Sequence, residues 1–262
     1  MTDPNPLVAG RGLERLRAAG IVTEHGLLAV EAHELNIGFV SRMTRGRPWV
    51  RLKAAATLDG KTALNNGVSQ WITGPAARAD GHRWRARACA ILTGIGTVRE
   101  DDPQLTVPDD PRTRHPLRVL VDATLAVSPE ARILQGEPIL IATAAADGVK
   151  AAALRSQGHE VIELPNAAGK VDLPRLMTEL GARGVNELHV EAGFKLNGSL
   201  VREGCVDELL LYLAPMLVGD AAQGLFNLPE LSSLQGAARL QLRDVRAIGA
   251  DLCLIARLNA AG

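Results

Sequence analysis

The chain of 262 residues is poor in aromatic side chains and has no excess of charge of either sign. Its 29 Lys and Arg residues balance 29 Asp and Glu residues, so no basic field exists to collect nucleic acid or an anionic membrane surface. Aromatic residues form 3% of the chain and offer few platforms on which single-stranded nucleic acid could stack. Nucleic acid and membranes are therefore disfavoured as partners.

The chain also lacks long apolar runs and recognisable disulfide or metal patterns. Its longest strongly apolar run, 209–218, contains Pro215 and has about half of the roughly twenty residues that a membrane span needs. The N-terminus has an acidic residue and two prolines where a signal peptide would be apolar. The three widely separated cysteines exclude a CxxC motif, and the six histidines form no HxH or HExxH pattern. These absences predict a soluble cytoplasmic enzyme or ligand binder, and no metal ion is assigned.

Residues 1–47 differ in character from the rest of the chain and are expected to form an appendage. A short helix is expected over 13–19 and a longer one over 27–43. The apolar residues of the second helix, expected on one face, are Leu27, Leu28, Val30, Leu35, Ile37 and Val40. The turn-forming segment 45–48 marks the boundary, so that a larger domain spans 48–262.

From residue 49 onward, short apolar strands alternate with helical segments. Strands are expected over 50–56, 90–93, 117–122, 138–142, 160–164 and 187–191, and helices over 75–88, 147–156 and 172–182. Thr73 is the expected N-cap of the first of these helices, with Pro75 in its first turn. This alternation predicts an α/β fold with a mainly parallel sheet covered by helices. A long strand over 207–217 and an antiparallel hairpin of 240–246 and 251–258 make the sheet mixed.

Two glycine-containing loops follow predicted strands. Residues 94–99 (GIGTVR) begin like the dinucleotide-binding pattern GxGxxG, but they lack its third glycine, and the acidic segment 100–103 ends the helix within about two turns. A plain strand-to-loop turn explains that spacing equally well. In the second loop, Glu191 ends a buried strand, and the backbone N–H groups of 193–199 could hold a pyrophosphate at a helix start. An ordinary strand–turn–helix connection is an equal alternative there.

Charged residues near these loops have two interpretations each. Lys53 lies in the middle of a largely apolar strand, where burying an ammonium group without a partner is costly. It either reaches solvent at a sheet edge or faces Glu191 in a cleft. The helix expected over 75–88 carries arginines at 78, 83, 85 and 87, which most often form a solvated face, although one or two could grip a phosphate bidentately. Trp71, just before that helix, is most often a core residue.

Five segments, taken together, resemble one enzyme family. They are LKAAATLDGKTA (52–63), SQWITGPAAR (69–78), ILTGIGTVREDDPQLTV (91–107), VLVDA (119–123) and VEAGFKLNGSL (190–200). In this order they resemble the reductase half of the riboflavin-biosynthesis enzyme diaminohydroxyphosphoribosylaminopyrimidine deaminase / 5-amino-6-(5-phosphoribosylamino)uracil reductase. Segments 3–21 and 34–50 resemble the end of its deaminase domain and the link to the reductase.

The resemblance implies the domain organisation and the activity. It makes 1–47 a remnant of the deaminase domain and 48–262 the reductase domain. The PCxxC-type pair of the deaminase zinc site does not occur, so we expect no deaminase activity. The fold is expected to be dihydrofolate-reductase-like, with NADPH as hydride donor. The expected reaction reduces C1′ of the phosphoribosylamino group to a ribitylamino group, after the ribosylamine ring has opened to an imine-like species.

The resemblance also implies the site residues, one matched position at a time. Substrate contacts fall on Ser69, Arg85, Asp101, Leu105 and Glu191. Nucleotide contacts fall on Ala55, Trp71, Thr97, Asp101, Gly193, Phe194, Lys195, Leu196, Asn197, Gly198 and Ser199. Lys53 matches a lysine that the family needs near the reacting carbon. We expect Lys53 and Glu191 to be catalytic and to form a pair that orients the opened substrate and relays its proton.

Two positions depart from the family pattern. Pro108 stands where the family often has an arginine for the substrate phosphate, which leaves Arg112 or Arg114 to substitute. Ala123, with Thr124 next, stands where a hydroxyl residue is frequent near the nucleotide.

Two further functions and one assembly complete the expectations. A dihydrofolate-reductase-like oxidoreductase could act on another pterin or pyrimidine. A non-catalytic NADPH-binding module is disfavoured because Lys53 and Glu191 are both present. A homodimer is expected, with the long apolar strand 209–218 at its contact.

Overall fold

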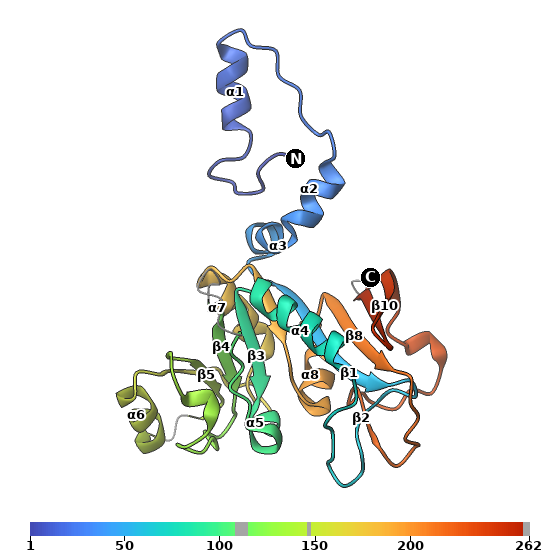
Figure 1. The fold of residues 1–262 in the computed structure, drawn as a ribbon. Helices are drawn as coiled ribbons and strands as arrows, with labels where there is room; N and C mark the ends of the chain where they lie inside the picture. The colour runs from blue at the N-terminus through green and yellow to red at the C-terminus, as the bar shows by residue number, and fades with distance from the viewer. Residues whose placement is uncertain (108–114, 146–147, 259–262) are drawn as a thin grey trace.

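The computed structural model describes residues 1–107, 115–145 and 148–258, and within them nine strands form one mixed sheet (Figure 1). The strands of this sheet are β1 (Trp49–Thr57), β3 (Ala90–Gly94), β4 (Leu117–Val121), β5 (Leu140–Thr143), β6 (Glu160–Glu163), β7 (Glu187–Val190), β8 (Glu208–Ala214), β10 (Leu240–Ile248) and β11 (Asp251–Leu258). Their order is β10-β11-β8-β1-β7-β3-β4-β5-β6. Two short strands, β2 (Lys61–Ala63) and β9 (Gln223–Gly224), form a separate antiparallel pair.

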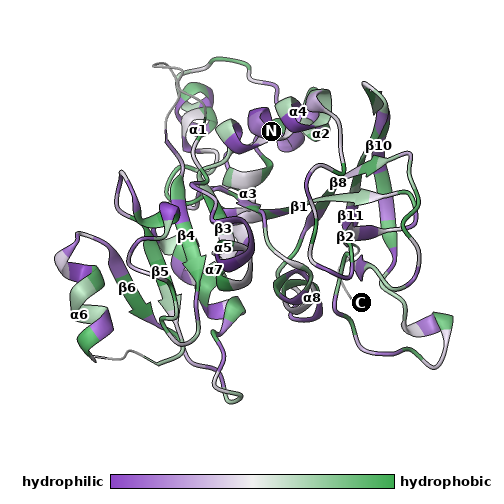
Figure 2. Ribbon diagram, turned by 60° about the horizontal axis from the view of Figure 1, so that its bottom comes forward, coloured by the Kyte–Doolittle hydropathy of each residue, from purple (hydrophilic) through white to green (hydrophobic). Residues whose placement is uncertain are grey.

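The pairing confirms the expected mixed sheet. All neighbours from β8 through β6 run parallel, whereas β11 pairs antiparallel with both β8 and β10. The central strands explain this arrangement, because β3 and β5 are buried at every position and can lie only between layers of helices. Figure 2 shows these strands as hydrophobic segments.

Helices cover both faces of the sheet, but they do so differently. The helices are α1 (Arg11–Ala18), α2 (Ala29–Leu35), α3 (Ile37–Arg45), α4 (Pro75–Arg87), α5 (Ile95–Asp101), α6 (Gly148–Ser156), α7 (Leu173–Ala182) and α8 (Phe194–Arg202). On one face, α7 and α8 pack on a continuous apolar cluster from β1, β3, β4, β5, β7 and β8. On the other face, α5 and α6 cover one apolar cluster and α4 covers a second, smaller one. None of the helices in the described part of the chain is long and apolar enough to cross a membrane.

The helix expected over 27–43 is instead two helices, α2 and α3, which separate at Asn36. Asn36 leaves the helical conformation (φ −110°, ψ 19°), and its side-chain amide donates to the carbonyl oxygen of Ala32. Asparagine favours such local bonds over a helix interior. The expected apolar face is split as a result, since Ile37 and Val40 are buried against the sheet domain while Leu27, Leu28, Val30 and Leu35 are exposed.

Two further expectations are wrong in detail. The N-cap of α4 is Gly74 and not Thr73, and the N–H of Gly74 is held in place by the carboxylate of Asp251, which accepts from it at 2.7 Å. The strand expected over 207–217 ends at Ala214 as β8, and it lies between β1 and β11. The interior position of β8 rules out the edge contact that was expected from 209–218. The free edge on this side of the sheet belongs to β10.

Helix α7 packs closely against the segment that leads into β1, and Gly181 lies at this contact. A Cβ atom at Gly181 would lie 2.2 Å from the carbonyl oxygen of Gly46, a backbone atom that cannot rotate away. We expect Gly181→Ala to lower the free energy of unfolding by about 1–3 kcal/mol, as overpacked sites do, in urea denaturation. Gly96→Ala is the matched control, because no atom lies within 4 Å of its added Cβ. Equal stability of both variants would contradict the contact.

Candidate active site

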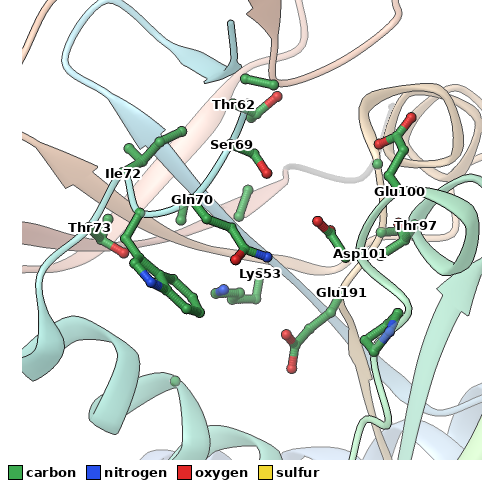
Figure 3. Close-up of a pocket in the computed structure, with 18 of the residues that line it drawn as sticks. Lys53, Thr62, Ser69, Gln70, Ile72, Thr73, Thr97, Glu100, Asp101 and Glu191 are labelled. Atoms are coloured by element: carbon green, nitrogen blue, oxygen red, sulfur yellow. The ribbon is translucent and has the colours of Figure 1, made fainter. Parts of the chain in front are cut away.

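A cleft of about 720 Å³ opens toward the carboxyl ends of β1, β3 and β7. Its walls come from β1, the segment 67–73, α4, α5 and the start of α8 (Figure 3). Ligands of open α/β sheets bind at this edge, and the volume is in the range of cofactor and small-molecule sites. Under α4, the charged side chains of Lys53, Arg85 and Glu191 interrupt the apolar packing and line the cleft. The cleft therefore places charged groups beside a largely apolar core.

Most of the residues expected in the site line this cleft. They are Lys53, Ala55, Ser69, Trp71, Arg85, Thr97, Asp101, Leu105, Glu191, Gly193, Phe194 and Asn197. Four expected nucleotide contacts, Lys195, Leu196, Gly198 and Ser199, lie in α8 but do not line the cleft. Ala123 and Thr124 do not line it either. Pro108, Arg112 and Arg114 lie outside the described residues.

Glu191 is held by Arg85 in a bidentate ion pair. Arg85 Nε donates to Glu191 Oε1 at 2.7 Å, and Nη2 donates to Oε2 at 2.9 Å. The remaining terminal nitrogen of Arg85 donates to the carbonyl oxygen of Thr106, which ties α4 to the segment after α5. Two parallel charge-assisted hydrogen bonds fix both the position and the plane of the carboxylate.

The charges around Glu191 keep it ionised. Burial raises the pKa of this carboxyl, but the contact with His189 and the positive charges of Lys53 and Arg85 outweigh burial, so the pKa lies well below its ordinary value. His189 contributes no charge of its own, because burial lowers the pKa of its imidazole. Glu191 is therefore an acceptor and an anchor at neutral pH, and not a proton donor.

The expected pair of Lys53 and Glu191 is not a direct contact. In the described part of the chain, the ion-pair partners within 4.0 Å of Glu191 are Arg85 and His189, and Lys53 acts on it only through space. Figure 3 shows both side chains projecting into the same cavity. The Lys53 side chain runs beneath α4, where a Cβ atom at Gly81 would lie 3.9 Å from its Cε. The expectation of a facing arrangement fits this geometry, while the direct partner of Glu191 is Arg85.

His82 was not expected in the site, and Arg78 was expected only as one of four arginines of which one or two could grip a phosphate, although the spacing of the two residues gives a signal. Positions 78, 82 and 85 are four and three residues apart, so α4 presents all three side chains on one face toward the cleft. Burial and the charges of Arg85, Lys53 and Arg78 lower the pKa of His82, while Glu191 opposes this effect. Arg78 stacks on Trp71 at 4.5 Å, and Trp71 is 67% exposed, so it is a wall of the cleft and not a core residue.

The start of α8 fits a polar cofactor. Gly193 precedes the helix without a side-chain hydrogen bond to its first N–H groups. Asn197 lines the cleft and is buried, and its Oδ1 has no hydrogen-bond partner among the described residues. This oxygen is enclosed by protein atoms, so a ligand in the cleft does not reach it in this arrangement. His189 and Glu191 have an HxE spacing, but no third His, Cys, Asp or Glu joins them into a metal-binding group in the described chain.

This combination of a mixed α/β sheet and a cleft with charged side chains at its carboxyl edge is typical of proteins that bind small molecules. Residues 48–254 match the family model of the RibD C-terminal domain. The riboflavin biosynthesis protein RibD of Escherichia coli (strain K12) is 43% identical over 268 residues, covering 97% of this chain and 72% of that protein. RibD of Haemophilus influenzae is 39% identical, with 97% and 70% covered.

Solved structures agree with this assignment. A structure of RibD from Acinetobacter baumannii has a TM-score of 0.88 at 34% identity, covering 99% of this chain and 71% of that one. A deaminase/reductase structure from Thermotoga maritima has a TM-score of 0.83 at 27% identity, covering 98% and 69%. The chain belongs to the family of RibD C-terminal domains, the reductase domain of riboflavin biosynthesis. It spans about 70% of the length of these relatives.

The lowered pKa of Glu191 predicts how acid affects stability. Because the folded-state pKa is below the unfolded value, the stabilisation by Glu191 is complete above its ordinary pKa of 4.5 and is lost as pH falls toward the depressed value. In urea denaturation between pH 5 and pH 3, we expect wild type to lose up to about 1.4 kcal/mol per pH unit more than Glu191→Gln. Exposed Glu230 supplies the control variant Glu230→Gln. Parallel pH curves for wild type and Glu191→Gln would refute the lowered pKa.

Proposed function

We propose that this domain reduces 5-amino-6-(5-phosphoribosylamino)uracil with NADPH, giving the ribitylamino product. The observation that carries the proposal is the convergence of Lys53, Arg85 and Glu191 in one cleft, with the start of α8 in the same wall. The cleft thus holds the positions matched to substrate together with most of those matched to nucleotide. The Thermotoga maritima relative is described as a reductase of this uracil derivative, which supports the same substrate here.

The proposed chemistry adds one hydride and one proton to an imine-like form of the substrate. NADPH, when bound, supplies the hydride to C1′ and leaves as NADP⁺. Lys53 projects into the cleft as an ammonium group and donates the proton to the adjacent nitrogen. Glu191 stays ionised and accepts hydrogen bonds from the opened sugar, which fixes C1′ in one orientation. The proton therefore comes from Lys53, and Glu191 positions the substrate.

The α8 end of the cleft is the proposed nucleotide site. The N–H groups that follow Gly193 lack a side-chain cap and favour a negatively charged phosphate. The pyrimidine and ribose parts of the substrate would then contact the other matched residues of the cleft, which are Ser69, Asp101 and Leu105.

The first test follows NADPH absorbance with the substrate generated by a separate, intact deaminase. We expect oxidation that needs both this chain and the deaminated substrate. Lys53→Ala and Glu191→Ala should each lower turnover by about 10²-fold or more, as loss of a proton donor or of its positioning partner does. Exposed Lys170 provides the control Lys170→Ala, with turnover near wild type.

NADPH binding, followed by fluorescence, separates catalysis from cofactor affinity in the same variants. Lys53→Ala and Glu191→Ala should retain it, and its loss in both would contradict the assignment. A substrate without the ribosyl phosphate should be turned over poorly. Equal turnover of this substrate would favour another pyrimidine or pterin.

We further propose that two copies associate through the free edge of β10. Leu242 is 61% and Val245 is 53% exposed on this outermost strand, and an unpaired edge with apolar side chains favours pairing with another strand. Light scattering should show a dimer for wild type and a monomer for the variant that combines Leu242→Lys and Val245→Lys. Leu217→Lys is the control at a leucine beyond β8 that is even more exposed, and it should stay dimeric. A monomeric wild type would refute this proposal.

A further inference from the structure

A histidine lies in the centre of the sheet beneath the candidate site. His189 in β7 stands beside Arg51 of β1 and Ile91 of β3 in the strand register, and its side chain is 1% exposed. It does not line the cleft. The imidazole Nε2 lies 3.4 Å from Oε1 of Glu191, two residues further along the chain and on the same face of the sheet.

The other neighbours of His189 do not satisfy its polar atoms. Within the described residues, neither ring nitrogen has a hydrogen bond of good geometry. Arg51 is itself bound to Glu208 at 2.6 Å and to Glu187 at 3.0 Å, and as a donor it cannot accept the imidazole N–H. Ile91 is apolar. Glu191 is thus the neighbour that can accept a hydrogen bond from the imidazole N–H.

A stability argument alone does not account for this histidine. An unsatisfied polar group in the interior destabilises the fold, while a leucine of similar size at the same place would leave no such group. A separation of 3.4 Å is longer than a formed N–H···O bond. Bonds of this kind are often long in the absence of substrate and shorten when it binds.

We propose that His189 is a positioning residue for Glu191, and that its Nε2–H supports Oε1 from beneath while Arg85 holds both oxygens from α4. The inference rests on the proposed function, in which Glu191 orients the substrate. The imidazole is well suited to this task because burial keeps it neutral, so it donates a hydrogen bond without adding another positive charge to a cleft that already holds Lys53 and Arg85. His189 does not touch the substrate and acts only through Glu191.

The first experiment compares His189→Leu and His189→Gln with Leu188→Ala. We expect His189→Leu to match or exceed wild type in free energy of unfolding, while kcat falls about tenfold and the KM for NADPH stays near its wild-type value. His189→Gln keeps an N–H donor near the position of Nε2 and should recover part of kcat. Leu188 is fully buried on the opposite face, so Leu188→Ala should lose stability and keep kcat. A stable His189→Leu enzyme with wild-type kcat would overturn the proposal.

A second measurement needs no substrate and separates this inference from the proposed function. The titratable and charged groups that face Glu191 are His189, Lys53, Arg85 and His82. A double-mutant cycle compares wild type, His189→Leu, Glu191→Gln and the double variant. Of the four facing groups, this cycle changes only His189. Without the imidazole, the pKa of Glu191 should rise toward 4.5, so the difference in acid sensitivity between Glu and Gln at position 191 should shrink. An unchanged difference would overturn the positioning role even if the enzyme were active. An inactive wild type with a reduced difference would instead refute the reductase assignment and keep the contact.

Discussion

A largely buried carboxylate directly after a central strand is the constraint on which the site depends. Burying the charge of Glu191 is costly unless positive or hydrogen-bonding groups surround it. Arg85 from α4 supplies the direct ion pair, Lys53 from β1 supplies a second charge, and His189 lies beneath. Three elements that are remote in sequence must therefore meet at one point, and the cleft is the space that remains between them. The same charges that make burial tolerable also set the chemistry of the site.

The two faces of the sheet have different roles: one mainly stabilises the fold, and the other carries the candidate site. The face under α7 and α8 is a continuous apolar cluster, and burial of that surface supplies the main driving force for folding. The face under α4 has two smaller apolar clusters with charged residues between them. There Arg51 pairs with Glu208 and Glu187 and stacks on Trp84 at 4.3 Å. Buried charges add little to the stability of a fold. The apolar face supplies that stability, and the other face can therefore carry the buried charges of the site.

The segment before β1 is joined to the sheet domain by charged contacts as well as by packing. Arg45 and Arg47 both bind Asp207, which also accepts from the backbone N–H of Val50. Glu34 in α2 pairs with Arg257 of β11. Helix α3 and the end of α2 are thus anchored to the sheet, whereas α1 extends away from it in Figure 1, and both α1 and α2 keep apolar side chains exposed. The boundary expected near residue 47 therefore follows a helix that already packs on the larger domain.

Local pattern was enough to predict the α/β class and the parallel core, whereas most residues of the cleft were implied by the resemblance of five segments to one enzyme family. Runs such as Ala90–Gly94 are apolar on both faces, and each matched segment is a short continuous stretch of chain, so neither inference needed distant contacts. The partners of the charges were decided only by the tertiary structure. Arg85 and Glu191 are 106 residues apart, and Asp251 accepts from the N–H of Gly74, which lies 177 residues earlier. Residues this far apart in the chain are brought together by the packing of the sheet, and no local spacing records such a contact.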